Sequence, residues 1–244
     1  MQKKLFFVVL FLITSTVINA QSGQFFDAPF GGGIGYVPAW YVPNIDPINS
    51  QLNEIGMSEL SSSGFYSSGI AGFLYVGFVK NLRVGGMGYG GSLSTSQTIE
   101  SESREVVYSL GGGGLTVEYT LPFIKDIGVS VGAAIGSGNL ELDIYRNSGD
   151  FTWEGTWEEL SNPNISSESY NRKLENSFWM FTPTINLDYP IYRFVSLRLG
   201  VGYQITFADD WTADNDQPVS NIPSDLNSNS FFIQSGIFIG FFSF

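Results

Sequence analysis

The chain has 244 residues, of which 14% are charged, 16% are aromatic and 29 are glycine. It contains no cysteine and no histidine, which excludes disulfides, thiolate metal sites and the most common catalytic base. Its net charge of −12 at pH 7 makes nucleic acid an unfavourable partner. The length suits a single all-β domain.

The first twenty residues have the order of a secretory signal. Two lysines precede an apolar run over residues 5–17, and the small residue Ala20 closes the segment. The alternative is a transmembrane anchor, but the run is shorter than the ~20 residues that a spanning helix needs. We therefore expect residues 1–20 to be a cleaved signal peptide and residues 21–244 to form one barrel domain.

Residues 30–40 predict a first strand that ends near Pro38. One helix follows, for which we expect Asp46 as N-cap, Pro47 at the first helical position and Gly56 just past the end. Because this helix lies in the long connection to the second strand, at residues 65–79, we expect it to form a short lid or plug.

Residues 82–97 and 104–121 predict a long hairpin. Each of these two strands is nearly twice as long as the ~10 residues that a strand needs to cross an outer membrane. The hairpin should therefore project beyond the membrane. The run Gly111–Gly114 invites a phosphate-binding interpretation, but no Lys-Ser/Thr pair or helical pattern follows it. Glycine here more simply permits barrel curvature and close approach of a neighbouring strand.

A fifth strand begins at residue 127, and its alternation changes phase at residues 136–138 before Leu140 and Leu142 continue it. Either a β-bulge or emergence from the membrane would produce this change. A sixth strand covers residues 179–189, a seventh residues 192–207, and an eighth closes the chain at residues 231–244. The connections alternate between long (41–64, 98–103, 147–175, 208–229) and short (80–81, 122–126, 189–192).

The seventh strand carries the clearest pattern. One face is apolar, from Val195 to Phe207 in steps of two, and the other is small or polar. The polar face has Ser, Gly, Gln and Thr where the solvent face of a soluble sandwich carries Lys, Glu and Asp. Small polar residues suit the crowded interior of a barrel of about eight strands whose apolar face meets lipid.

Aromatic residues gather near both ends of the strands, as at the two interfaces of a membrane. They are Phe78, Phe123, Tyr189, Tyr192, Phe194 and Phe244 at the short-turn end, and Trp40, Phe65, Trp179 and Phe207 at the long-loop end.

With its signal segment, eight alternating strands and terminal IFIGFFSF, the sequence resembles the small eight-stranded outer-membrane barrels of the OmpA-barrel, OmpX and OmpW group. The resemblance implies an all-β, antiparallel, transmembrane up-and-down barrel, here with one short helix in the first long loop. It also implies a bacterial outer-membrane location in contact with lipid and lipopolysaccharide, and a monomeric state. A terminal aromatic strand read by the barrel-assembly machinery would correspond to Phe238, Phe242 and Phe244.

Alternation places Glu118, Arg83 and Arg198 on the inner face near the short-turn end. A buried charge needs a partner, so we expect these residues to form an ion-pair cluster in the lumen. By the resemblance the cluster could act as a gate; the alternative is a fixed structural plug, since eight strands enclose little more than their own side chains.

The long loops are acidic, with nineteen acidic residues against four basic ones, which leaves about −15. The rim could capture cations or contact lipopolysaccharide through divalent ions, or it could simply be a solvated, repelling surface. Asp209, Asp210, Asp214 and Asp216 are weak candidates for Ca²⁺, since their spacing matches no EF-hand loop. Trp153, Trp157 and Trp211 are candidate loop contacts.

Three functions remain open from the sequence. The first is a structural or interaction barrel whose loops meet an external partner; the second is a narrow or gated channel for small or apolar solutes; the third is a soluble exported barrel that encloses a ligand. We expect no enzyme activity and no cofactor, because the chain lacks histidine and shows no carboxylate pair on one face.

Overall fold

The computed structural model describes residues 30–99, 102–122, 124, 127–147, 152–161, 169–192 and 194–243. The strands are β1 (Phe30–Tyr36), β2 (Ala39–Pro43), β3 (Phe65–Tyr75), β4 (Leu82–Ile99), β5 (Glu102–Thr120), β6 (Gly128–Asn147), β7 (Tyr170–Tyr192), β8 (Val195–Ala208), β9 (Thr212–Ala213), β10 (Gln217–Pro218) and β11 (Ser230–Ser243). The helices are α2 (Asp46–Glu54) and α3 (Trp153–Ser161). The predicted signal peptide lies outside these residues. Among the residues described, no helix is long and apolar enough to cross a membrane.

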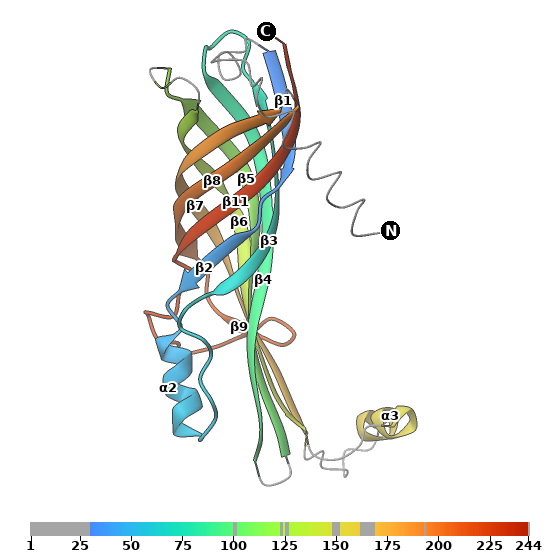
Figure 1. The fold of residues 1–244 in the computed structure, drawn as a ribbon. Coiled ribbons are helices and arrows are strands. Elements are labelled where there is room, and N and C mark those ends of the chain that lie inside the picture. The colour runs from blue at the N-terminus through green and yellow to red at the C-terminus, as the bar shows by residue number, and fades with distance from the viewer. Residues whose placement is uncertain are drawn as a thin grey trace, which may run out of the picture.

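The strands close into an antiparallel ring of eight (Figure 1). Each strand from β3 to β8 pairs with the next, β8 pairs with β11, and β1 and β2 together fill the place between β11 and β3. The break between β1 and β2 falls at Val37 and Pro38, since proline has no amide hydrogen to donate. The predicted barrel is confirmed, and the first strand pairs with the last along its length.

The connections divide between the two ends of the barrel (Figure 1). The turn between β3 and β4 lies with the C-terminal end of β11 at one end, while α2, the adjoining ends of β4 and β5, α3 and β9 lie toward the other. The second strand is shorter than predicted: β3 ends at Tyr75, and Asn81, with a φ of 64°, closes the turn before β4. The helix begins at Asp46 itself, so Asp46 is not its N-cap, whereas Gly56 has the positive φ expected after the end.

The strand β6 shows how the wall is built. Its even-numbered residues face inward along the whole strand, and its pairing with β5 and β7 has no register shift. Up to Ile135 the outward residues are apolar; from Leu140 onward it is the inward residues that are apolar. The phase change in the sequence is therefore not a bulge. It marks the point at which the apolar residues change from the outer to the inner face of the wall, which is called here the exchange of the apolar side.

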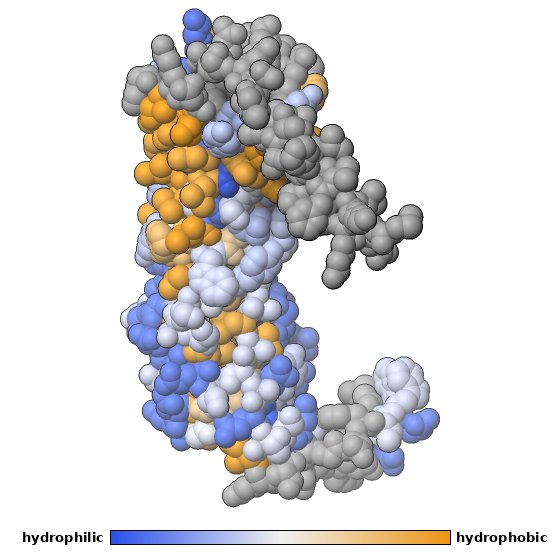
Figure 2. Space-filling model, viewed as in Figure 1, coloured by the Kyte–Doolittle hydropathy of each residue, from blue (hydrophilic) through white to orange (hydrophobic). Residues whose placement is uncertain are grey.

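The exchange divides the barrel into two halves. Between the short turns and mid-height, the outer surface is an apolar belt (Figure 2). Its exposed residues include Ile34, Ile70, Leu74, Val84, Leu115, Val117, Val131, Ile135, Phe181, Ile185, Leu187, Leu197, Leu199, Val201, Ile237 and Ile239. Trp40, Trp179 and Phe207 are also exposed, as predicted for an interface, but Phe65 is buried inside the wall. Phe123 and Phe244 lie outside the described residues.

The other half, called here the projecting half, has a hydrophobic core of its own. It consists of the outer parts of β4, β5, β6 and β7, covered on their inner side by α2 and the loop between β8 and β11. The core contains Tyr41, Ile45, Ile48, Leu52, Met57, Leu60, Phe65, Val106, Tyr108, Leu110, Leu140, Leu142, Phe178, Met180, Trp211, Leu226 and Phe232. An apolar inside with a polar outside is the arrangement of a water-exposed domain.

Candidate functional site

Four charged side chains meet in the lumen near the short turns. Arg83 lies 2.9 Å from Glu118 and 2.8 Å from Asp188, and Arg198 lies 2.9 Å from Glu118 and 2.7 Å from Asp188. All four side chains are at most 8% exposed. Two arginines balance two carboxylates, so the cluster is neutral as a whole, which is what burial of charge requires. The three residues predicted from the sequence do come together.

The fourth member, Asp188, was not predicted to join the cluster, since it lies at the boundary between the predicted sixth strand and the following turn. In the structure β7 continues to Tyr192, so Asp188 still belongs to the wall and lies directly opposite Arg198 on β8. The signal that identifies it is the alternation of β7, since Thr182, Asn186 and Asp188 are all buried at even positions.

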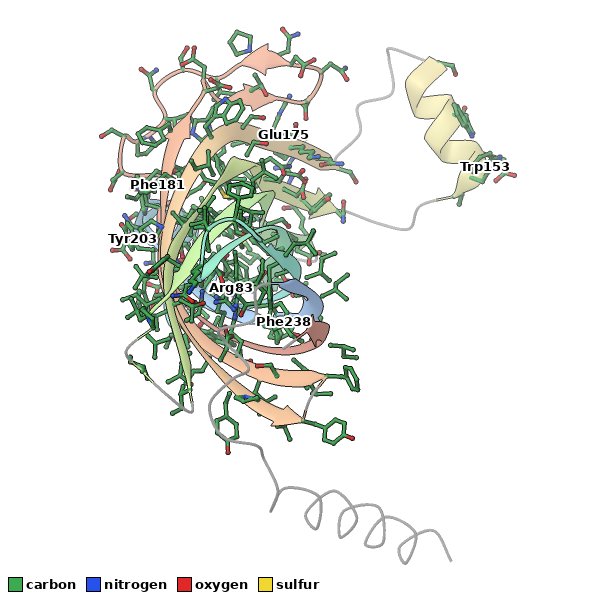
Figure 3. All side chains as sticks on the ribbon, turned by 90° about the horizontal axis from the view of Figure 1, so that it is seen from above. Arg83, Trp153, Glu175, Phe181, Tyr203 and Phe238 are labelled. Atoms are coloured by element: carbon green, nitrogen blue, oxygen red, sulfur yellow. The ribbon has the colours of Figure 1, made fainter. Side chains whose placement is uncertain are left out.

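Aromatic rings and amides surround the cluster. The guanidinium of Arg83 lies 4.8 Å from the ring centroid of Phe73, and that of Arg198 lies 4.6 Å from the ring of Phe238. Figure 3 shows Arg83 and Phe238 inside the ring, whereas Phe181 and Tyr203 point away from it. Asn186 donates to Glu118 over 3.2 Å. Every charged group thus has several partners, as expected of a rigid cluster.

A small cavity lies on the mid-height side of the cluster. It has a volume of about 30 Å³ and is lined in part by Thr116, Thr184, Arg198 and Gln234. Since one water needs roughly 10–15 Å³ by this measure, the cavity has room for about two waters. It is too small for a larger solute, and most of the residues that line it are apolar.

Stacked rings fill the lumen at mid-height. The ring centroid of Tyr41 lies 4.8 Å from that of Phe232 and 5.1 Å from that of Tyr89. The Tyr89 hydroxyl donates to the side-chain oxygen of Gln204, and the Gln204 amide donates to the carbonyl of Ser228 over 2.9 Å. The ring stack is continuous with the projecting core, and together with the ion cluster they fill the lumen from mid-height to the short turns.

The projecting half leaves one strand edge open. The pairing of β3 with β4 ends at Gly91, but β4 continues to Ile99 and there, among the described residues, pairs with β5 alone. Ser58 bonds only to side chains of this edge: it accepts from the Thr95 hydroxyl over 3.0 Å and donates to the Gln97 side chain over 3.0 Å. The segment 92–99, called here the open edge, contains no proline and no charged residue, which are the usual means of protecting an edge strand.

The outward side of the projecting sheet is acidic. Glu141 on β6 lies opposite Glu175 on β7, and the ammonium of Lys173 bridges the two carboxylates, at 3.2 Å from Glu141. Desolvation raises the pKa of the neighbouring Asp143, and the charges of Glu141 and Glu175 act in the same direction. Three carboxylates against one ammonium leave this surface anionic.

The three tryptophans predicted as loop contacts differ in position. Trp153 and Trp157 lie on α3 and are 73% and 52% exposed. Trp211 is 8% exposed and packs in the projecting core, so the prediction that it meets an external partner is wrong. The loop that carries Trp211 folds back over the inner face of the sheet. Burial of the indole stabilises the loop in this position.

The acidic residues of the last long loop do not converge. Asp214 forms an ion pair with Arg172 and also accepts from the backbone amide of Lys173 over 3.1 Å. Within the described part of the chain, no three potential metal-ligating side chains lie together. Asp209, Asp210 and Asp216 are exposed in the same loop, and calcium binding by these residues stays an untested prediction.

The predicted assembly signal lies on the last strand. Phe238 points into the lumen and is 2% exposed, and Phe242 pairs through its backbone with Gly31 of β1. Phe244 is outside the described residues. The structure thus gives Phe238 a packing role against Arg198, while recognition by the assembly machinery stays a prediction.

Similarity to known proteins is seen in structure and not in sequence. No protein-family model matches the sequence, and no curated protein matches it either. Among solved structures, the outer membrane protein OprG from Pseudomonas aeruginosa is 12% identical, with 90% of this chain and 99% of that chain covered and a TM-score of 0.47. A major outer membrane protein from Thermus thermophilus is 10% identical, with 86% and 99% covered and a TM-score of 0.46.

Neisserial surface protein A is also 10% identical, with 87% of this chain and 97% of that chain covered and a TM-score of 0.44. At such identities the likeness concerns the fold alone, and the ring of eight strands is established by the strand pairing itself.

Proposed function

We propose that this protein is a bacterial outer-membrane barrel that serves as an anchor and presents its projecting half to an extracellular protein. The observation that carries the proposal is the exchange of the apolar side of the wall, seen between Ile135 and Leu140 on β6. The apolar belt suits lipid, and the projecting half suits water. A soluble ligand-binding barrel would need its apolar side inward along the whole wall.

The filled lumen favours an anchor over a channel. Conduction would require the ion cluster, the stacked rings of Tyr41 and Tyr89, and the projecting core to move aside together. Each of these levels is packed and has its own bonding partners. A narrow or gated route for small or apolar solutes is the alternative, and it predicts measurable channels.

The open edge is the surface that we assign to the partner. An edge strand offers unpaired backbone donors and acceptors to an extended segment of another protein. Such a segment would extend the sheet beyond β4, with alternate side chains beside Leu93 on the inner face and beside Ser94 on the outer face. Because the surrounding rim is acidic, a segment with basic outward residues is favoured.

The anchor is tested by refolding residues 21–244 in lipid vesicles, comparing gel mobility with and without boiling, and recording planar-bilayer conductance. A heat-modifiable band without conductance supports the proposal, and stable channels support the alternative. For the open edge, the probes are two labelled peptides of equal charge, (Val-Lys)₄ and (Pro-Lys)₄. Strand addition predicts tighter binding of the valine peptide, since proline offers no amide hydrogen; equal binding would mean attraction by charge alone.

A further inference from the structure

The helix α3 carries two tryptophans that no described part of the chain covers. Trp153 and Trp157 lie four residues apart, so both are on one side of the helix. Their ring centroids are 5.5 Å apart and their planes meet at 75°. The helix stands away from the strands to which it is connected (Figures 1 and 3). Two largely exposed indoles at the tip of a protein are a strong indication of a binding surface.

Helix stability alone does not account for the pair. A contact between side chains four residues apart adds only ~0.2–0.5 kcal/mol to a helix, and a leucine or methionine pair serves as well. The hydroxyl of Thr152 already accepts from the amide of Gly155 over 3.0 Å and so caps the first turn. The size and exposure of the two indoles therefore call for another explanation.

The charges beside the rings indicate which partner they take. Glu154 and Glu158 are exposed next to the two tryptophans, and the helix sequence contains no basic residue. Helices that lie on membranes carry lysine or arginine on their polar side, so α3 is unsuited to an anionic lipid surface. A cation stacked on the exposed face of one indole, beside the second ring and with carboxylates on the same helix, gains from both the rings and the charges.

Resting on the proposed contact with an extracellular protein, we propose that the Trp153–Trp157 pair binds arginine side chains of that partner. A guanidinium is planar, is weakly hydrated and stacks on aromatic faces, whereas the ammonium of lysine is compact and strongly hydrated. The two ring planes at 75° form a corner with one face for stacking and one wall beside it. Glu154 and Glu158, each one position along the helix from a tryptophan, add negative charge near the bound guanidinium.

The test uses the full chain in lipid nanodiscs, with labelled octa-arginine and octa-lysine as probes and fluorescence anisotropy as the readout. Octa-arginine should bind more tightly than octa-lysine, and Trp153→Leu combined with Trp157→Leu should weaken octa-arginine binding about tenfold, as two exposed cation–π contacts predict. Octa-lysine binding should change less than about threefold. Leucine retains the helix, and Trp179→Leu, in the apolar belt, is the matched control.

Equal binding of the two peptides, or octa-arginine binding that is unchanged in the double variant, would overturn the assignment. Cosedimentation with phosphatidylcholine vesicles that depends on the two tryptophans, without a preference for arginine, would assign α3 to a membrane and overturn it as well. The two substitutions on α3 leave the barrel and the open edge unaltered. Heat-modifiable mobility, conductance and (Val-Lys)₄ binding therefore report separately on the proposed function.

Discussion

Ile135 and Leu140 lie five residues apart on one unbroken strand and point to opposite sides of the barrel wall. Ile135 is 61% exposed on the outside, and Leu140 is completely buried inside. No bulge separates them, because β6 keeps its register with both neighbours. The wall is continuous while its environment changes, from lipid outside the belt to water outside the projecting half.

The core of the projecting half should therefore respond to mutation like the core of a soluble protein. Leu140→Ala is expected to lower the free energy of unfolding by about 2–5 kcal/mol, since it leaves a cavity among packed side chains. Asn139→Ala, at the adjacent outward position, should change it by no more than about 0.5 kcal/mol. Urea unfolding in vesicles measures both; equal effects would contradict the exchange of sides.

Removal of any one charged side chain from the ion cluster should destabilise the protein, because its buried partners then lose their neutralising charge. Asp188→Ala leaves two buried guanidiniums with one carboxylate and should cost about 3–5 kcal/mol. Asp210→Ala, at an exposed loop position, is the control and should have little effect. The Asp188 variant should remain non-conducting in planar bilayers, because the ring stack of Tyr41 and Phe232 still fills the lumen. Opening of channels in this variant would instead identify the cluster as a gate.

Asn49 should hold the covering segment in place. It is buried on α2, donates to the carbonyl of Leu60 over 3.0 Å and accepts from the amide of Leu60 over 2.9 Å. Asn49→Ala leaves both backbone groups unpaired, at a cost of about 1–3 kcal/mol. Limited proteolysis should then cleave residues 55–64 faster than in the wild type or in the control Gln51→Ala, at an exposed position of the same helix. Unchanged cleavage would show that the segment is held by apolar packing alone.

Asp143 should make the projecting half slightly less stable at neutral pH. Desolvation raises its pKa, so the folded state holds this proton more tightly than the unfolded chain does. Ionised Asp143 lowers the free energy of unfolding by its full amount above the raised pKa, and this loss disappears below the ordinary pKa of ~3.9. Asp143→Asn should thus raise the free energy of unfolding at pH 7 by less than about 1 kcal/mol, as expected for a partly exposed group, and the gain should fade toward pH 4. A variant that is less stable at pH 7 would contradict this account.

Alternation along the strands was sufficient to predict the barrel and the lumen positions of Arg83 and Arg198, and the length of the strands at 82–97 and 104–121 predicted the projecting hairpin. It did not predict Asp188, because a turn and a strand end look alike in sequence when the boundary is uncertain by a few residues. Nor did it predict burial of Trp211, since its loop is acidic and only the fold shows that it returns over an apolar sheet. The phase change at residues 136–138 had two explanations until strand pairing separated them.

The most direct test of the exchange is labelling of single cysteines along β6, in a chain that has no cysteine of its own. Ile135→Cys, Asn139→Cys and Leu140→Cys are refolded in vesicles and treated with a membrane-impermeant maleimide. Position 139 should react quickly, position 140 should be protected by packing, and position 135 should react only with a lipid-soluble maleimide. Rapid reaction of position 135 with the impermeant reagent would place the belt in water and contradict the account.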